Sequence, residues 1–84
     1  YIITSATDAV TQRIMKEMDR GVTHLMAKGA YSGKERPVVL CVLSNQEVAR
    51  LKDIVREEDE RAFMFVTGAH EALGEGFSKL SGED

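Results

Sequence analysis

Six consecutive apolar residues occur in the segment Pro37-Val38-Val39-Leu40-Cys41-Val42-Leu43-Ser44. The run is short, rich in β-branched side chains and bounded by the single proline and a serine, which is typical of a strand rather than a helix. Because side chains alternate across a strand, successive residues beginning with Val38 and Val39 point to opposite faces. Both faces of this strand are therefore apolar, and we expect both to be covered in the native protein.

The composition limits the classes of protein and of site. The chain has 84 residues, the size of one domain, with 43% hydrophobic and 30% charged residues, as in ordinary globular proteins. Its net charge of −3 argues, though weakly, against nucleic acid or anionic lipid as a partner. One cysteine cannot form an internal disulfide, and with only two histidines we expect neither a metal site nor a cofactor.

The chain has no apolar run of the ~18 residues that a membrane-spanning helix needs. It starts within a strand-like pattern at Tyr1-Ile2-Ile3, without a methionine. We therefore expect it to be a fragment of a longer protein.

Hydrophobic periodicity and turn residues predict six elements in order. These are strands at 1–4, 22–27, 37–43 and 62–67, a helix at about 5–19 after the first strand, and a helix that starts at Ser44 after the third strand. The order β-α-β-β-α-β is that of a ferredoxin-like α+β domain, with two helices on one face of a four-stranded antiparallel sheet of order 4-1-3-2. We expect the domain to cover 1–77 and a flexible tail to cover 78–84.

Local signals predict where the helices begin and end. Ser5-Ala6-Thr7-Asp8 and Ser44-Asn45-Gln46-Glu47 both have the spacing of a capping box, in which a hydroxyl residue is followed three positions later by an acid. Gly21 is predicted to end the first helix. A proline at the first position of the strand at 37–43 removes no ladder hydrogen bond.

Two helices cover only one face of such a sheet, so the other face is left with large apolar side chains. This open face would carry half of the strand at 37–43 and either Phe63 and Phe65 or Met64 and Val66. Leaving four or five such side chains in water forgoes on the order of 10 kcal/mol, which is comparable with the whole stability of a domain. We expect another copy of the chain or the parent protein to cover this face; alternatively the helices, the tail and the 69–77 segment wrap it partly.

The sequence shows no catalytic constellation, and we expect no enzyme. Cys41 lies inside the apolar strand, where a buried thiol is inert. His24 and His70 have no carboxylate at a spacing that forces a dyad, and Ser32 is not in a nucleophile elbow. An RNA-recognition motif has the same element order but needs aromatic residues on its third strand. The strand at 37–43 has none, so nucleic acid is not expected.

The loop at 28–36 is the candidate ligand site. It contains the cations Lys28, Lys34 and Arg36, together with Gly29 and Gly33. Cations and flexible backbone amides can form an anion-binding nest, and Tyr31 can stack on an apolar part of a ligand. We therefore predict ligand contacts from Gly29, Tyr31, Ser32, Gly33, Lys34 and Arg36. The alternative is an ordinary long polar hairpin loop.

The chain resembles the C-terminal domain of the YitT-type multi-pass bacterial membrane proteins. The resemblance rests on words in family order, which are Gly21-Val22-Thr23, Gly29-Ala30-Tyr31-Ser32-Gly33, Val39-Leu40-Cys41-Val42, Leu51-Lys52-x-Ile54-Val55, Ala62-Phe63 and Leu73-Gly74-Glu75-Gly76-Phe77. It implies a PII-like variant of the ferredoxin fold, attached to a membrane domain at the cytoplasmic face of the membrane. It also implies a homo-oligomer, in PII-like proteins typically a trimer, with small-molecule sites in the clefts between subunits.

Two functions follow as hypotheses. The first is a regulatory module that binds a small anionic metabolite or nucleotide at subunit clefts lined by the 28–36 loop and closed by Gly74–Phe77. The second is an oligomerisation module that binds no ligand and holds membrane subunits together through the open sheet face.

Overall fold

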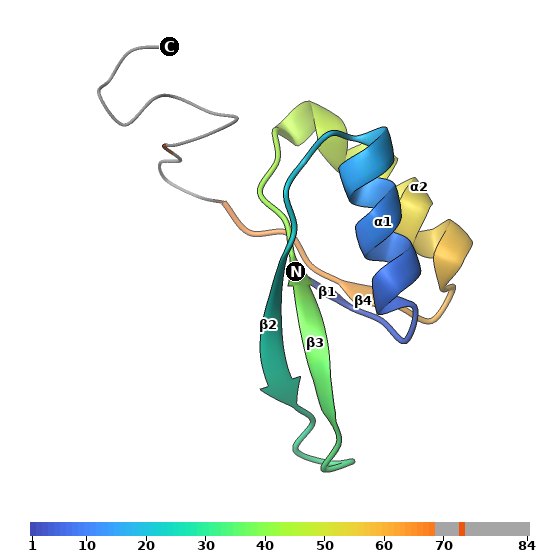
Figure 1. Ribbon diagram of the computed structural model, residues 1–84, viewed down its shortest axis with the longest axis vertical. Coiled ribbons are helices and arrows are strands. Elements are labelled where there is room, and N and C mark those ends of the chain that lie inside the picture. Colours follow the sequence, from blue (N-terminus) through green and yellow to red (C-terminus); the bar gives the residue numbers. More distant parts are fainter. Residues whose placement is uncertain (69–72, 74–84) are drawn as a thin grey trace.

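The computed structural model describes residues 1–68 and 73, and it has the predicted element order (Figure 1). The elements are β1 Ile2–Ile3, α1 Thr7–Glu17, β2 Thr23–Lys28, β3 Glu35–Leu40, the 3-10 helix η1 Asn45–Glu47, α2 Val48–Glu58 and β4 Phe63–Met64. The predicted tail at 78–84, the domain boundary at 77, His70 and the segment Gly74–Phe77 lie outside the described residues.

The four strands form one antiparallel sheet of order β2-β3-β1-β4, which confirms the predicted topology. Ile2 of β1 lies opposite both Val39 of β3 and Met64 of β4. Both helices pack on the same face of this sheet (Figure 1). The arrangement is the predicted ferredoxin-like α+β fold, with β3 and β1 in the centre.

The core lies between this sheet and the two helices. Ile2 and Val39 contribute from the sheet, and both side chains are almost completely buried. The four-residue spacing of Val10 and Ile14 places both on the inner side of α1. Helix α2 contributes Leu51, Ile54 and Val55 from the predicted stripe. Periodicity thus predicted the helix faces correctly.

The strand boundaries differ from the prediction because a strand ends where its partner ends. β3 was predicted at 37–43 but covers Glu35–Leu40, and β4 was predicted at 62–67 but covers Phe63–Met64. β1 begins at Ile2, so no strand lies beside the residues that follow β3 and β4. At its other end β3 continues to Glu35, opposite Lys28 of β2. Pro37 therefore lies inside β3, at a point where only β2 flanks the strand.

Two predicted helix ends are also wrong. No capping box forms at 5–8, because the residue before the helix is Ala6, which has no hydroxyl, and no side chain caps the first turn. The residue in the left-handed conformation after α1 is Asp19, with φ of 54°, rather than Gly21. The second capping box is confirmed, since Glu47 accepts the Ser44 N–H at 2.9 Å.

Candidate functional site

The hairpin formed by β2 and β3 projects beyond the body of the domain (Figure 1). Every residue from 23 to 36 is exposed, and the molecule measures 45 × 25 × 19 Å. The connecting loop covers only 29–34, shorter than the predicted 28–36, because the cross-strand pairing continues to Lys28 and Glu35. The candidate ligand residues therefore lie at the tip of an exposed finger.

The tip is a tight turn in which several backbone N–H groups form hydrogen bonds within the turn. Gly29 donates its N–H to the Lys34 carbonyl at 2.9 Å, and Gly33 donates to the Gly29 carbonyl at 2.8 Å. The N–H of Lys34 donates to the Ser32 hydroxyl at 3.2 Å. These three amides are not available to an anion while the turn is closed.

Both glycines have a conformational role in this turn. Gly33 has a φ of +71°, which side chains with a Cβ rarely adopt. A Cβ on Gly29 would lie 2.8 Å from the Ser32 hydroxyl oxygen. The shape of the tip therefore accounts for both positions, and their predicted part in ligand binding stays a prediction.

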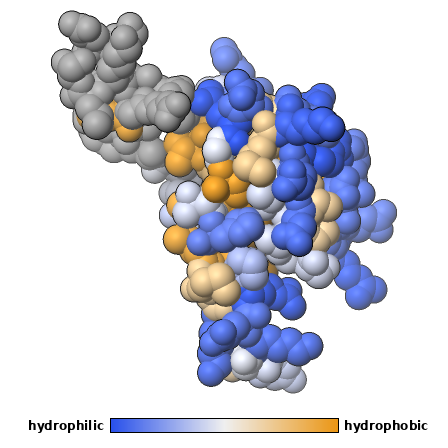
Figure 2. Space-filling model, in the orientation of Figure 1, coloured by the Kyte–Doolittle hydropathy of each residue, from blue (hydrophilic) through white to orange (hydrophobic). Residues whose placement is uncertain are grey.

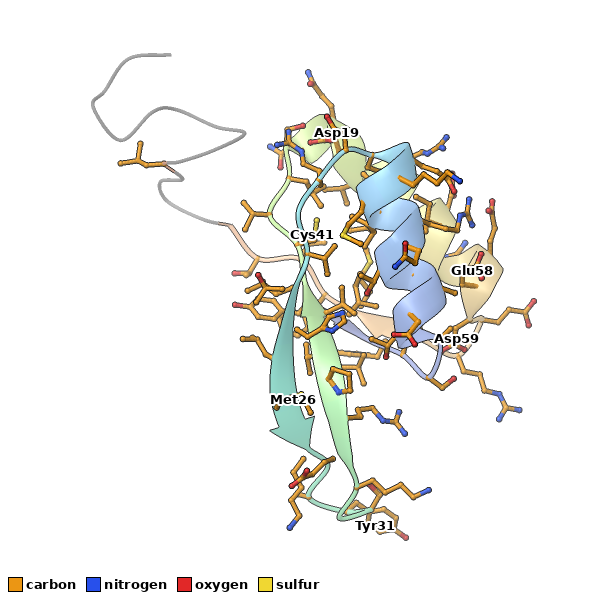
Figure 3. The ribbon with its side chains drawn as sticks, viewed as in Figure 1. Asp19, Met26, Tyr31, Cys41, Glu58 and Asp59 are labelled. Atoms are coloured by element: carbon orange, nitrogen blue, oxygen red, sulfur yellow. The ribbon has the colours of Figure 1, made fainter. Side chains whose placement is uncertain are left out.

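The side chains at the tip are available for contact. Tyr31 is fully exposed at the end of the finger (Figure 3). The side chains of Lys28, Lys34 and Arg36 form no ion pair within the part of the chain that the structure describes. Lys28 lies opposite Glu35 and Arg36 lies opposite Ala27, so Lys28 and Arg36 are on opposite faces of the hairpin. One copy of the chain does not bring all three cations to one face.

The sheet face remote from the helices is the second candidate site, and we call it the open face. Ile3 pairs with Phe63, and Leu25 pairs with Val38, all on the face opposite to Ile2 and Val39. Phe63 is 60% exposed and Leu25 is 42% exposed. Of the two alternatives for the last strand, Phe63 and Phe65 therefore lie on this face, whereas Met64 packs towards the core.

Aromatic rings extend the open face. The rings of Tyr1 and Phe65 stack with centroids 4.9 Å apart, and the Phe65 ring lies 6.1 Å from that of Phe63. In Figure 2 hydrophobic atoms gather on the sheet side of the molecule, whereas hydrophilic atoms cover the helices. The open face is thus an apolar surface, as the pattern of the apolar strand predicts.

A groove, not predicted from the sequence, lies at the end of the sheet where β3 and β4 exit. Its volume is about 630 Å³, and its two walls are residues 40–45 and 64–68. Tyr1 lies at one end of the groove, and Val48 and Leu51 of α2 contribute to its lining. We call it the exit groove. The one sequence signal for it is that both apolar runs continue past the last paired residues, Leu40 and Phe65.

Other polar and titratable groups have structural explanations. Burial raises the pKa of the Cys41 thiol, which agrees with an inert packing role. The His24 Nε2 lies 2.9 Å from the Thr11 hydroxyl, a contact that ties β2 to α1. Within residues 1–68 and 73, no group of three or more His, Cys, Asp or Glu side chains is placed to hold a metal ion.

The helix side carries an ion-pair network rather than a site. Arg13 bonds to Glu17 at 2.6 Å, to Glu57 at 2.8 Å and to Glu58 at 3.1 Å. The contacts with Glu57 and Glu58 join α1 to the end of α2, and the hydrogen bond from Arg13 holds the pKa of the Glu17 carboxyl below its usual range. In the described part of the chain, no helix has the length and apolar character that crossing a membrane requires.

Comparison with known proteins finds relatives that are named as membrane proteins of bacteria. It is 44% identical over 78 residues to the UPF0750 membrane protein YvjA of Bacillus subtilis, covering 93% of this chain and 28% of that protein. It is 34% identical over 62 residues to the UPF0750 membrane protein YitT of the same organism, covering 74% and 22% of the two chains. An uncharacterized protein of Bacillus sp. is 47% identical over 78 residues, with coverage of 93% and 52%. The chain thus spans between about a quarter and a half of these relatives' lengths.

A solved structure and a family description agree with this placement. The crystal structure of an uncharacterized DUF2179 protein from Eubacterium ventriosum has a TM-score of 0.70 and 33% identity, covering 79% of this chain and 90% of that one. Residues 20–74 match the family described as "Uncharacterized protein conserved in bacteria (DUF2179)". The chain therefore belongs to the DUF2179 family, as a domain of the kind that YitT-type membrane proteins contain.

Proposed function

We propose that this domain joins the subunits of a bacterial membrane protein by packing its open face against further copies of itself. The carrying observation is the exposed apolar surface around Phe63, which continues across the sheet through Ile3 to Leu25 and Val38. An apolar surface of this kind marks an interaction site in a soluble domain. The proposal includes no catalysed reaction.

The size of the apolar gain predicts a concentration-dependent association. Ile3, Leu25, Phe63 and Phe65 are each between 36% and 60% exposed. Burying what remains of these four side chains gains about 3–6 kcal/mol per chain. Association costs on the order of 4–15 kcal/mol in lost freedom, so the isolated domain is expected to associate weakly. Attachment to a membrane domain raises the effective concentration and strengthens the contact.

Sedimentation velocity over a range of concentrations up to about 1 mM tests this proposal. We expect association that Phe63→Asp weakens at least tenfold, because a carboxylate would be desolvated in the interface. Met15→Asp is the matched control, since Met15 is 42% exposed but lies on α1, away from the sheet. A monomer throughout the range, or equal effects of the two substitutions, would contradict the proposal. The PII-like resemblance implies a trimer.

A second candidate function is regulation by a small anionic metabolite or nucleotide. It is supported by the exposed Tyr31 and by the cations of the tip, which have no ion-pair partner among the described residues. Arg36 lies on the open face, two residues before Val38, so association through this face would put Arg36 at a boundary between copies. A ligand in that cleft would meet Lys34, Arg36 and Tyr31.

Thermal shift with a panel of nucleotides and anionic metabolites tests the second function. We expect a bound ligand to raise the melting temperature, and Lys34→Gln with Arg36→Gln to abolish the shift. Lys52→Gln with Arg56→Gln, both on α2, is the charge-matched control. An unchanged melting temperature for the whole panel under conditions where the chain is associated leaves only the assembly function.

We also propose that the domain lies at the cytoplasmic face of the membrane. The resemblance to the C-terminal domain of YitT-type proteins supports this position, since it implies a domain that faces the cytosol. A reporter enzyme that is active only in the cytoplasm, fused after the domain in a full-length relative, is expected to be active. Activity of a reporter that works only outside the cytoplasm would place the domain on the opposite side.

A further inference from the structure

The exit groove lies in line with β1. β1 is flanked by β3 on one side and by β4 on the other. Tyr1 continues this strand, since its backbone N donates to the Phe65 carbonyl at 3.0 Å and its carbonyl accepts the Phe65 N–H at 3.1 Å. Two strands that flank a third are two strand spacings apart, or about 9–10 Å. Past Tyr1, the walls of the groove therefore enclose a gap with the width of one strand.

The backbones of the two walls lack partners in this gap. Within residues 1–68 and 73, the segments 41–43 and 66–68 form no backbone hydrogen bond. Both segments were predicted as strand up to Leu43 and Thr67. Each segment presents a partly covered valine, with Val42 45% exposed and Val66 58% exposed. Such edges bind an additional strand readily.

The volume of the groove fits a short extended segment. A residue in a sheet occupies about 160 Å³, which is the product of its rise, the spacing between strands and the spacing between packed layers. The groove volume of about 630 Å³ therefore holds about four residues of strand. Past Tyr1 the walls contain residues 41–45 and 66–68, which is a similar length.

We propose that the exit groove binds an extended polypeptide segment that continues β1, and that in a longer protein of this family this segment is the one that directly precedes Tyr1. Such a segment has the correct direction, because it is antiparallel to both β3 and β4 as β1 is. It is also covalently tethered at the end of the groove, which lowers the entropic cost of docking. Relatives such as YvjA are several times longer than this chain, so they contain polypeptide to fill the groove.

The lining defines the chemistry of the segment. Among residues 1–68 and 73, none of those that line the exit groove has a charged side chain, and the side towards α2 presents Val48 and Leu51. The bound segment is therefore uncharged, with an apolar side chain at alternate positions directed at Val48 and Leu51. The bound segment would pair with the residues that follow β3 and with those that follow β4. The connection to the preceding part of the protein would then be a rigid central strand. This inference does not depend on the proposed self-association.

Hydrogen exchange tests the inference by comparing this chain with the same chain extended by the six or so residues encoded directly before Tyr1 in its gene. A control carries a Gly-Ser extension of equal length. We expect at least tenfold slower amide exchange in the segments 41–43 and 66–68 and a higher melting temperature for the native extension only. Equal exchange in all three chains, or equal protection by the Gly-Ser extension, would overturn the proposal.

A substitution in the wall provides a second test. Cys41→Pro removes a backbone donor that has no partner in the present chain and that faces the gap, because N–H groups alternate along a strand and Val39, two residues earlier, faces β1. It is expected to lower the melting temperature of the extended chain more than that of the present chain, and an equal loss in both would overturn the proposal. Protection that instead rises with concentration in the present chain would identify a second copy as the occupant and overturn the tethered assignment.

Discussion

Thr4 donates its hydroxyl to the Asp59 carboxylate at 2.7 Å, across 55 residues of sequence. Thr4 is buried directly after β1, and Asp59 is the residue that ends α2. The same carboxylate accepts the N–H of Ser5 at 3.2 Å and the N–H of Arg61 at 3.0 Å. These bonds hold the turn into α1 beside the turn into β4, and the Thr4 hydroxyl is the largest cause that keeps the pKa of Asp59 below its usual range.

Thr4→Val is expected to lower the free energy of unfolding by about 1–3 kcal/mol. Valine has nearly the same shape, but it removes the donor to Asp59 and also the acceptor for the Ala6 N–H. Urea denaturation measures the loss. Thr23→Val on the exposed strand β2 is the control, because the Thr23 side chain is not buried. Equal stabilities of the Thr4→Val variant and the original chain would show that the Thr4–Asp59 bond contributes nothing.

The lowered pKa of Glu47 predicts that the free energy of unfolding depends on pH in the acid range. Hydrogen bonds from Arg20 and from the Ser44 backbone lower the pKa of Glu47 from the usual 4.5 to about 2. A carboxyl whose folded pKa lies below its unfolded value stabilises the fold above the unfolded pKa, and this stabilisation is lost as the pH falls through the folded pKa. The loss is therefore expected between about pH 5 and pH 2.

Glu47→Gln is expected to remove part of this dependence, because glutamine has no proton to gain. The measurement is the free energy of unfolding by urea at pH values across that window. Glu35→Gln on the exposed hairpin is the matched control and should leave the acid dependence unchanged. If the slopes of the original chain and of Glu47→Gln agree, the ion pair with Arg20 does not couple to folding.

The parts of the fold that could be predicted are those that depend on periodicity. The helix faces, the element order and the apolar character of both faces of β3 follow from the spacing of residues such as Val10, Ile14 and Val39. Strand ends could not be predicted, because the end of β3 depends on where β1 begins, and a strand cannot be paired beyond its partner. The exit groove was missed for the same reason.

The candidate ligand site was predicted only as a set of neighbours in the sequence. The loop composition gave the tip residues, but not the hydrogen bonds that use the amides of Gly29, Gly33 and Lys34. Nor did it give the alternation that separates Lys28 from Arg36. Both properties depend on the cross-strand register, which is set by pairing partners rather than by composition.

The C-terminal end of α1 gives a prediction that separates Asp19 from Gly21. Asp19 has a φ of 54°, which costs a side chain with a Cβ about 1–2 kcal/mol before local hydrogen bonding. Asp19→Gly is therefore expected to raise the free energy of unfolding by about 0.5 kcal/mol, since relief of strain exceeds the added chain entropy. Thermal and urea unfolding measure the change.

Gly21→Ala is the paired test. The φ of Gly21 is not positive, and a Cβ there would meet no atom within 4 Å. Alanine is expected to stabilise the domain by about 0.4–1 kcal/mol by restricting the unfolded chain. Destabilisation by Gly21→Ala, together with no gain from Asp19→Gly, would restore Gly21 as the residue that ends the helix.

The tip of the hairpin gives a prediction that separates its shape from its charge. Gly33→Ala is expected to destabilise the turn by about 1 kcal/mol, because the φ of +71° at Gly33 is unfavourable for alanine. Gly33→Asn is the control, since asparagine tolerates this conformation better than other residues with a side chain. Amide exchange at Gly33, which donates to the Gly29 carbonyl, measures the opening of the turn.

Because residues 23–36 are exposed and project from the core, this opening should be local, with faster exchange at the tip and little change in the global unfolding free energy. If the tip binds an anion through its side chains, Gly33→Asn keeps the affinity and Lys34→Gln loses it. If binding requires the amides of an opened turn, Gly33→Ala strengthens binding by raising the population of that state. If the amide of residue 33 exchanges equally slowly in the original chain, in Gly33→Ala and in Gly33→Asn, the left-handed conformation at this position does not hold the turn closed.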